Sequence, residues 1–241
     1  MRPLAVVKVG GSLRADPARL SGLLAALADG VHGRCVIVPG GGAFADAVRE
    51  AQRRDGFDDS VAHRLALDAM GRMAKVFHAI EPRLSLRSVV PAALSPLRGR
   101  VALASARVGR GERPFRTTRS PHPTRFAGPP LPHRGEGKAR SLAQHETVVW
   151  DPALLKAGHP DIAETWDVTS DSLALWLARG IGAARCVLVK SADAPSGRSP
   201  ADLARLGLVD AAFPAFAARF AGCIELWGPA GIATLPDRIA A

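Results

Sequence analysis

Two runs of glycine, each between a short apolar segment and a helical pattern, constrain the fold of this chain most. Gly10 and Gly11 end the segment 4–9 (LAVVKV), and Gly40, Gly41 and Gly42 follow the segment 34–38 (RCVIV). Residues 17–28 and 43–54 show the patterns of the helices that follow each run. Repeated strand–loop–helix units of this length predict an α/β fold with a parallel sheet and right-handed crossovers.

The composition agrees with this fold class. Hydrophobic residues make up 47% of the 241 residues, and tyrosine is absent, so the core must consist mostly of Val, Leu, Ile and Ala. Such a core favours parallel strands buried by helices on both faces. The length suits one large α/β domain or two small ones.

Further elements follow along the chain. A longer helix is predicted over 58–80, with its inward side formed by Val61, Leu65, Met73, Val76 and Phe77. Beyond residue 146 the apolar segments predict strands over 147–150, 185–190 and 223–227, and helices over 170–179, 200–206 and 213–220. Thr169 or Ser170 is expected to cap the helix over 170–179.

Residues 107–140 interrupt this order. They contain six prolines, five glycines and almost no apolar periodicity, which predicts a disordered insertion. Nine basic residues against two acidic ones give the segment seven of the chain's ten net positive charges. The insertion either has no function or is a basic loop near an anionic ligand. The rest of the chain is only mildly basic, so we expect no nucleic-acid partner.

The cysteines and the apolar segments indicate a cytoplasmic protein. Cys35, Cys186 and Cys223 lie far apart without metal-ligand spacing, and we expect three reduced core thiols. No stretch approaches the roughly 20 apolar residues that cross a bilayer, and the first residues do not resemble a signal peptide. We therefore expect no membrane association.

The glycine runs are expected at the carboxyl ends of parallel strands, where open α/β sheets bind ligands. Glycine lets backbone N–H groups approach an anion closely, and a following helix adds its positive end. Lys8 lies two residues before the first run. Its charge either meets a bound phosphate or forms an ordinary salt bridge. The glycines could also serve only as tight turns.

Asp171 opens the helix over 170–179, directly after Thr169 and Ser170. An acid in the first turn can simply complement the helix dipole. Alternatively, it can orient Lys8 and a second cation around a phosphoryl group, since phosphoryl transfer depends on positioning and charge neutralisation. The spacing leaves both interpretations open.

Three segments in this order resemble the amino acid kinase superfamily: VVKVGGSL (6–13), VIVPGGGAFADAVRE (36–50) and WDVTSDSLALWLA (166–178). The resemblance implies a three-layer α/β/α sandwich with a mostly parallel central sheet, formed by residues 1–241 as a single domain. Its N-terminal half would bind the acceptor and its C-terminal half ATP. A homo-oligomer is also implied.

Finer features are similar to the small kinases of methanofuran biosynthesis. They are the segments AHRLALDAM (62–70), DIAETWDVTSDSLA (161–174) and LVDAAFPAFAARF (208–220). These kinases convert an aminomethylfuran-methyl monophosphate to its diphosphate. The resemblance implies a small phosphorylated acceptor, with ATP and Mg²⁺ as cofactors. The ATP phosphates would hold Mg²⁺, so no dedicated metal site is expected.

The same resemblance implies roles for individual residues. Lys8 would hold the transferring phosphate and Asp171 would organise the catalytic lysine. The ATP-binding residues would be Gly10, Gly11, Ser12, Thr169, Ser170, Lys190, Asp193 and Arg198. The acceptor-binding residues would be Gly40, Gly41, Gly42 and His63, although His63 also fits an ordinary helix position.

The chain departs from the superfamily pattern after Asp193. Ala194 and Pro195 replace the usual glycine, and no lysine follows Lys190, so Arg198 is the proposed substitute for a second lysine. Two alternatives remain. One is a kinase of the same superfamily for a nucleoside monophosphate, an isoprenoid phosphate or a carboxylate. The other is a non-catalytic protein that binds nucleotides or nucleic acid.

Overall fold

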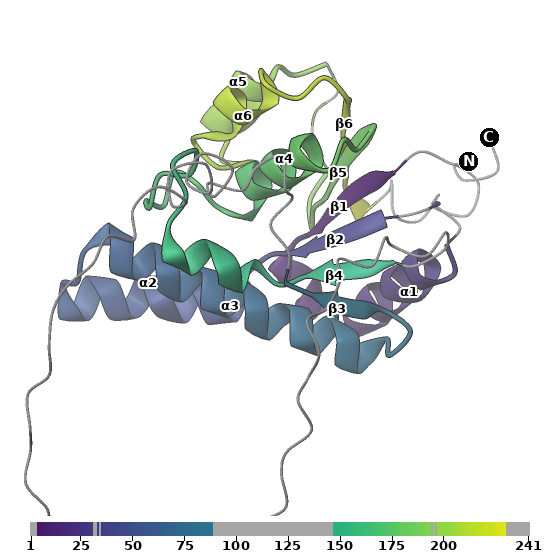
Figure 1. Ribbon diagram of the computed structural model, residues 1–241, viewed down its shortest axis with the longest axis horizontal. Helices are drawn as coiled ribbons and strands as arrows, with labels where there is room; N and C mark the ends of the chain where they lie inside the picture. Colours follow the sequence, from purple (N-terminus) through teal and green to yellow (C-terminus); the bar gives the residue numbers. More distant parts are fainter. Residues whose placement is uncertain are drawn as a thin grey trace, which may run out of the picture.

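One parallel sheet forms the centre of the molecule (Figure 1). The computed structural model describes residues 4–30, 33, 35–88, 147–193, 195 and 197–229. Within these residues six strands pair in the order β3-β4-β2-β1-β5-β6, and every pairing is parallel. The strands are β1 (Ala5–Val9), β2 (Cys35–Pro39), β3 (Ser85–Arg87), β4 (Val148–Trp150), β5 (Arg185–Val189) and β6 (Cys223–Trp227). The predicted insertion at 107–140 lies outside the described residues.

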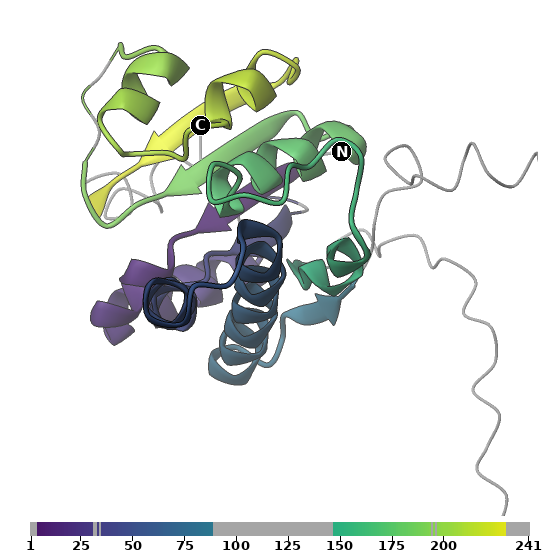
Figure 2. The same cartoon turned by 90° about the vertical axis from the view of Figure 1, so that its left-hand side faces the viewer.

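Helices cover both faces of the sheet. Figures 1 and 2 show α1 and α3 on one side and α4, α5 and α6 on the other. The α-helices are α1 (Pro17–Ala28), α2 (Ala43–Asp55), α3 (Asp59–Ile80), α4 (Ser170–Gly180), α5 (Pro200–Arg205) and α6 (Phe213–Ala217); the 3-10 helices are η1 (Gly11–Ala15) and η4 (Pro152–Ala157). The predicted α/β/α sandwich is confirmed.

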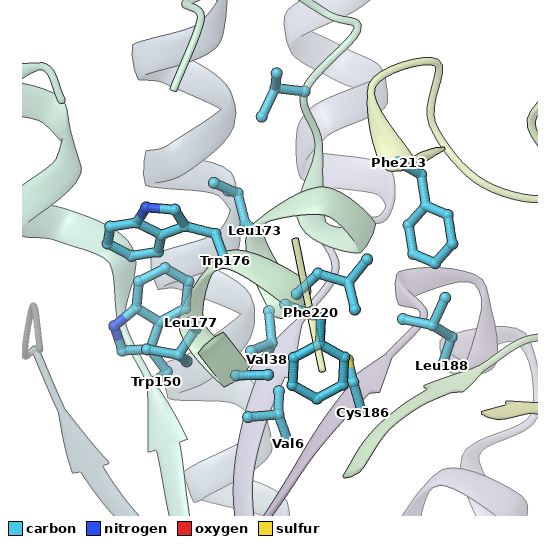
Figure 3. Close-up of a cluster of buried hydrophobic side chains, with 14 of the residues drawn as sticks. Val6, Val38, Trp150, Leu173, Trp176, Leu177, Cys186, Leu188, Phe213 and Phe220 are labelled. Atoms are coloured by element: carbon cyan, nitrogen blue, oxygen red, sulfur yellow. The ribbon is translucent and has the colours of Figure 1, made fainter. Parts of the chain in front are cut away.

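The central strands are apolar because both of their faces are buried. Val6 of β1 pairs with Val36 and Cys186, and its side chain points into the core under α4. Val7 and its pairing partners on the two adjacent strands point to the opposite face, into the core over α1. Figure 3 shows strand residues packed against residues of α4 and the segment around α6: Val6, Val38, Cys186 and Leu188 against Leu173, Trp176, Leu177, Phe213 and Phe220.

The thiols divide differently from the prediction. Cys35 and Cys186 are buried, and burial raises their pKa values to about 11 and about 12, so both stay protonated. Cys223 is exposed, and its assignment to the core was wrong. It begins β6, the strand at one edge of the sheet that the described residues form.

The inward face of α3 also differs from the prediction. Val61 and Leu65 are 39% and 40% exposed, whereas Met73 and Phe77 are fully buried as predicted. The buried stripe begins at His63 and continues through Leu67, Met70, Ala74 and Phe77 at spacings of three and four residues. Val61 and Leu65 each lie two residues before a member of this stripe, and residues two apart on a helix do not share a face. Because the stripe starts with a polar histidine, the pattern of apolar residues alone did not predict the correct buried face of α3.

The topology places a crevice at the carboxyl end of β1. The chain leaves β1 toward α1, whose leucines pack on one face of the sheet, and it leaves the neighbouring β5 toward α5 on the opposite face. Ligands of open α/β sheets bind where connections diverge in this way. Among the helices of the described segments, each is too short or too polar to cross a membrane.

Candidate active site

A cavity of about 560 Å³ opens at this end of the sheet. It brings together residues from five parts of the chain: the end of β1 with the loop and 3-10 helix that follow it, the loop after β2, helix α2, helix α3, and the start of α4 with the segment before it. The predicted residues that line it are Lys8, Gly11, Ser12, Gly40, Gly41, Gly42, His63, Thr169 and Ser170. Its walls also include Arg14, Asp46, Arg49 and Trp166, which the sequence did not single out.

The two glycine runs touch each other. A Cβ added to Gly11 would lie 2.3 Å from both the Cα and the N atom of Gly42, and Gly42 itself has φ +53°. Gly40 N–H donates to the Val9 carbonyl at 2.8 Å, which fixes the second loop to the end of β1. Only glycine allows this approach. The loops therefore form one continuous backbone surface on the cavity.

A buried carboxylate joins two lysines beside this surface. Lys8 Nζ lies 3.0 Å from Asp171 Oδ1, and Lys190 Nζ lies 2.7 Å from Asp171 Oδ2. Lys8 is 6% exposed and Asp171 5%. Lys8 comes from the buried strand β1, Asp171 from the first turn of α4, and Lys190 directly follows β5. The salt bridge that the sequence allowed for Lys8 is present, and Lys8 also lines the cavity.

The electrostatics of this cluster keep the carboxyl group ionised. Burial opposes the charge on Asp171, but Lys8 and Lys190 hold the pKa of that carboxyl below its ordinary value. Burial and the neighbouring Lys8 charge lower the pKa of Lys190 to about 8. The charge of Asp171 acts in the opposite direction and only partly offsets this lowering. Lys190 is therefore a cation that can lose its proton within a mildly alkaline range.

Asp210 fixes the start of α4. Its carboxylate accepts hydrogen bonds from Thr169 N at 2.9 Å, Thr169 Oγ1 at 2.8 Å and Ser172 N at 3.0 Å, as well as from the Ser172 hydroxyl. Thr169 occupies the N-cap position as predicted, but its hydroxyl does not cap the helix. Asp210, 41 residues later than Thr169, takes that role and holds the turn that presents Asp171.

His63 is buried at the wall of the cavity, where burial favours its neutral form. Its Nδ1 lies 3.2 Å from the carbonyl oxygen of Thr165, and because a carbonyl only accepts, Nδ1 is the protonated nitrogen. Burial lowers the pKa of His63 below its ordinary value. The Nε2 atom then keeps its lone pair.

The sequence model of the amino acid kinase family matches residues 3–194. This chain belongs to the amino acid kinase family. The match includes both glycine loops, Lys8, Asp171 and Lys190. Family membership makes the chain a phosphotransferase, as predicted, and kinases of this family use ATP, usually with Mg²⁺.

Solved kinase structures share this fold. Uridylate kinase from Archaeoglobus fulgidus is similar with a TM-score of 0.53 and 14% identity, covering 96% of this chain and 95% of that protein. UMP kinase from Ureaplasma parvum is similar with a TM-score of 0.56 and 11% identity, covering 99% and 96%. At these identities the likeness shows the fold alone.

A curated relative has a closer sequence over a shorter stretch. The [5-(aminomethyl)furan-3-yl]methyl phosphate kinase of Methanocaldococcus jannaschii is 36% identical over 75 residues. The alignment covers 31% of this chain and about a third (35%) of that protein.

Some residues predicted to bind ATP lie away from the cavity walls of this amino acid kinase. Gly10 and Lys190 are not among the lining residues, although Lys190 contacts Asp171. Asp193 and Arg198 are exposed in the segment after β5, and Asp193 packs against Gly228. Ser12 Oγ donates to Ser191 Oγ at 3.1 Å and so joins the first glycine loop to this segment. Ala194 lies outside the described residues.

Proposed function

We propose that this amino acid kinase transfers the γ-phosphoryl group of ATP to the phosphate of a small acceptor, [5-(aminomethyl)furan-3-yl]methyl phosphate, and forms its diphosphate. The observation that carries the proposal is the Lys8–Asp171–Lys190 cluster beside a cavity bounded by two touching glycine loops. The name of the Methanocaldococcus jannaschii relative supplies the acceptor.

The residues present fit ATP on one side of this cavity and the acceptor on the other. Gly10, Gly11 and Ser12 would hold the ATP phosphates, together with Thr169 and Ser170 at the start of α4. Gly40, Gly41 and Gly42 would receive the acceptor phosphate, and His63 would contact it. Glycine lets the backbone N–H groups of such loops approach a phosphate closely. Asp193 and Arg198 would contact the nucleotide from the loop after β5.

Mg²⁺ would bind mainly to the ATP phosphates, where it neutralises part of their charge. Among the described residues, no group of three His, Cys, Asp or Glu side chains is placed to hold a metal ion.

The lysine cluster suits phosphoryl transfer. An oxygen of the acceptor phosphate forms the new bond to the γ-phosphorus, the bond from that phosphorus to the β,γ-bridging oxygen breaks, and ADP leaves. The acceptor oxygen is already ionised, so no general base is needed. Lys8 and Lys190 would offset the charge on the transferring group, while Asp171 keeps the two ammonium groups together despite their repulsion.

We further propose that residues 1–241 act as a single kinase domain in the cytoplasm, with an acceptor-binding N-terminal half and an ATP-binding C-terminal half. By analogy with the superfamily we propose a homo-oligomer.

A panel of acceptors tests the proposed reaction. Purified protein with ATP and Mg²⁺ should release ADP only when the furan phosphate is added. Faster turnover with UMP, an isoprenoid phosphate or a carboxylate would replace the acceptor but keep the kinase. ATP binding without turnover of any acceptor would favour a non-catalytic nucleotide-binding protein instead.

The charge of Lys190 should appear in the pH dependence of the enzyme. Because its pKa is about 8, we expect kcat/KM for ATP to fall above about pH 8 as the ammonium loses its proton. Lys190→Arg should retain measurable activity and lack this fall, because a guanidinium stays charged. An identical alkaline fall in both proteins would show that another group titrates.

The free energy of unfolding should rise with pH over the range in which kcat/KM falls. The Lys190 pKa lies below its ordinary value of 10.5, so between about pH 8 and 10.5 the unfolded chain binds the proton more tightly than the folded one. The contribution of Lys190 to the free energy of unfolding therefore rises with pH in that window.

A further inference from the structure

Two arginines line the cavity, and each lies against an aromatic ring. The guanidinium carbon of Arg49 lies 4.2 Å from the centroid of the Trp166 ring, and that of Arg14 lies 5.5 Å from the centroid of the Phe44 ring. Stacking on a ring attracts the cation and restricts its movement. Neither arginine has a part in the phosphoryl-transfer cluster described above.

Trp166 is itself held in place. Its indole N–H donates to Gln52 Oε1 at 2.6 Å, and the amide group of Gln52 donates to Asp59 Oδ1 at 2.8 Å and to the Phe57 carbonyl at 3.2 Å. The indole is therefore anchored to the turn between α2 and α3, and the Arg49 side chain lies on a fixed surface.

The neighbours of Trp166 are anchored in the same way. Glu164 accepts a hydrogen bond from Arg64 at 2.8 Å, and the Thr165 carbonyl bonds to His63. The segment that leads into α4 is thus attached to α2 and α3 on one side. The Arg49–Trp166 contact joins the N-terminal and C-terminal halves across the cavity wall.

The acidic side chains described at the cavity do not neutralise both arginines, so positive charge remains for a ligand. Asp171 offsets the charge of Lys8 at 3.0 Å. Among the described lining residues, Asp46 is the one with an acidic side chain. The Asp46 carboxylate lies 3.2 Å from the Arg49 guanidinium, and 72% of the Asp46 side chain is exposed. One exposed carboxylate cannot offset two guanidinium groups. An anion is therefore favoured in the cavity in addition to the phosphoryl group that Lys8 and Lys190 would hold.

We propose that Arg49, held against Trp166, acts with Arg14 to bind the acceptor's own phosphate and so selects a phosphorylated acceptor over its unphosphorylated alcohol. The planar fork of a guanidinium matches the oxygens of a phosphate and makes paired hydrogen bonds to it. This inference rests on the proposed function and deepens it, because it assigns the acceptor's charged group to particular side chains.

Variants of the two stacked residues test the proposal through kinetics. Arg49→Ala should raise KM for the furan phosphate about 10- to 100-fold, the range for one lost charge-assisted contact, with KM for ATP nearly unchanged. Arg49→Lys should recover less than half of that loss on a logarithmic scale, because an ammonium lacks the fork. Trp166→Phe should keep most of the affinity, whereas Trp166→Ala should lose about tenfold.

Arg53→Ala is the matched control. Arg53 lies one turn further along α2, pairs with Glu50 and is not among the cavity-lining residues. Its removal should change KM for the acceptor by less than about twofold, the size expected for an exposed ion pair. A rise in KM for ATP alone in Arg49→Ala, or an unchanged KM for the acceptor, would overturn the assignment.

Calorimetric binding separates this inference from the kinase proposal. The probes are the furan phosphate, its unphosphorylated alcohol and UMP. The wild type should bind a phosphate monoester more tightly than the alcohol, and Arg49→Ala should lose that preference even if no turnover occurs. The inference would be refuted if the wild type bound monophosphates no more tightly than Arg49→Ala while the enzyme turned over a carboxylate acceptor. The protein would then still be a kinase.

Discussion

Lys8→Ala is expected to lower kcat roughly a thousandfold, the size seen when a positioned cation is removed from phosphoryl transfer. Lys8 is 6% exposed and lies on the cavity wall 3.0 Å from Asp171 Oδ1, so water does not readily replace its charge. The measurement is ADP formation in a coupled assay at saturating ATP and acceptor.

Lys75→Ala provides the control for this loss. Lys75 is exposed on α3 and does not line the cavity, so its removal should leave kcat within about twofold. Turnover by Lys8→Ala close to the wild-type rate would mean that Lys8 serves only as a structural salt bridge.

Asp171→Asn should have the largest effect on stability. Without the carboxylate, two largely buried ammonium groups lose the charge that holds them together. Removing one partner of a buried ion pair lowers the free energy of unfolding by about 3–5 kcal/mol. Denaturant unfolding at pH 7 measures this change, and activity should fall in parallel because the lysines move apart.

Two further variants sharpen that result. Asp167→Asn removes an exposed carboxylate from the same segment and should change stability by less than about 0.5 kcal/mol. Adding Lys8→Met to Asp171→Asn removes one of the repelling charges and should restore part of the stability without restoring activity. A loss below about 1 kcal/mol in Asp171→Asn would mean that the cluster is well solvated.

The sheet could be predicted from sequence because its signals are local. β1 and β2 are short apolar runs that end at glycine, and both faces of each strand are buried as such runs predict. β3 was missed because Ser85–Arg87 is short and contains one apolar residue, whereas the equally short β4 is apolar throughout and was predicted. The 3-10 helix η4 was not predicted. The helix predicted over 213–220 ends at Ala217, so its predicted C-terminal end was wrong.

The cavity could be predicted only in part. Lys8, Gly11, Gly42 and Asp171 belong to recognisable segments, and the structure brings them together. Their roles in ATP and acceptor binding stay predictions until they are measured.

Asp210, Arg49 and Trp166 depend on tertiary contacts that leave no local pattern. Asp210 caps a helix that begins about 40 residues earlier in the chain, and Arg49 meets Trp166 from a different half of the fold. Helical spacing places Arg49 on α2 but does not show that its side chain reaches a cavity.

The central claim is the transfer of a phosphoryl group from ATP onto a phosphate beside the Lys8–Asp171–Lys190 cluster. The most direct test is ³¹P NMR of purified protein incubated with ATP, Mg²⁺ and [5-(aminomethyl)furan-3-yl]methyl phosphate. We predict that the monophosphate signal is replaced by the coupled pair of a diphosphate monoester as ADP accumulates, and that Lys8→Ala shows no such change. Release of inorganic phosphate alone, or an unchanged acceptor signal alongside ADP, would contradict the account.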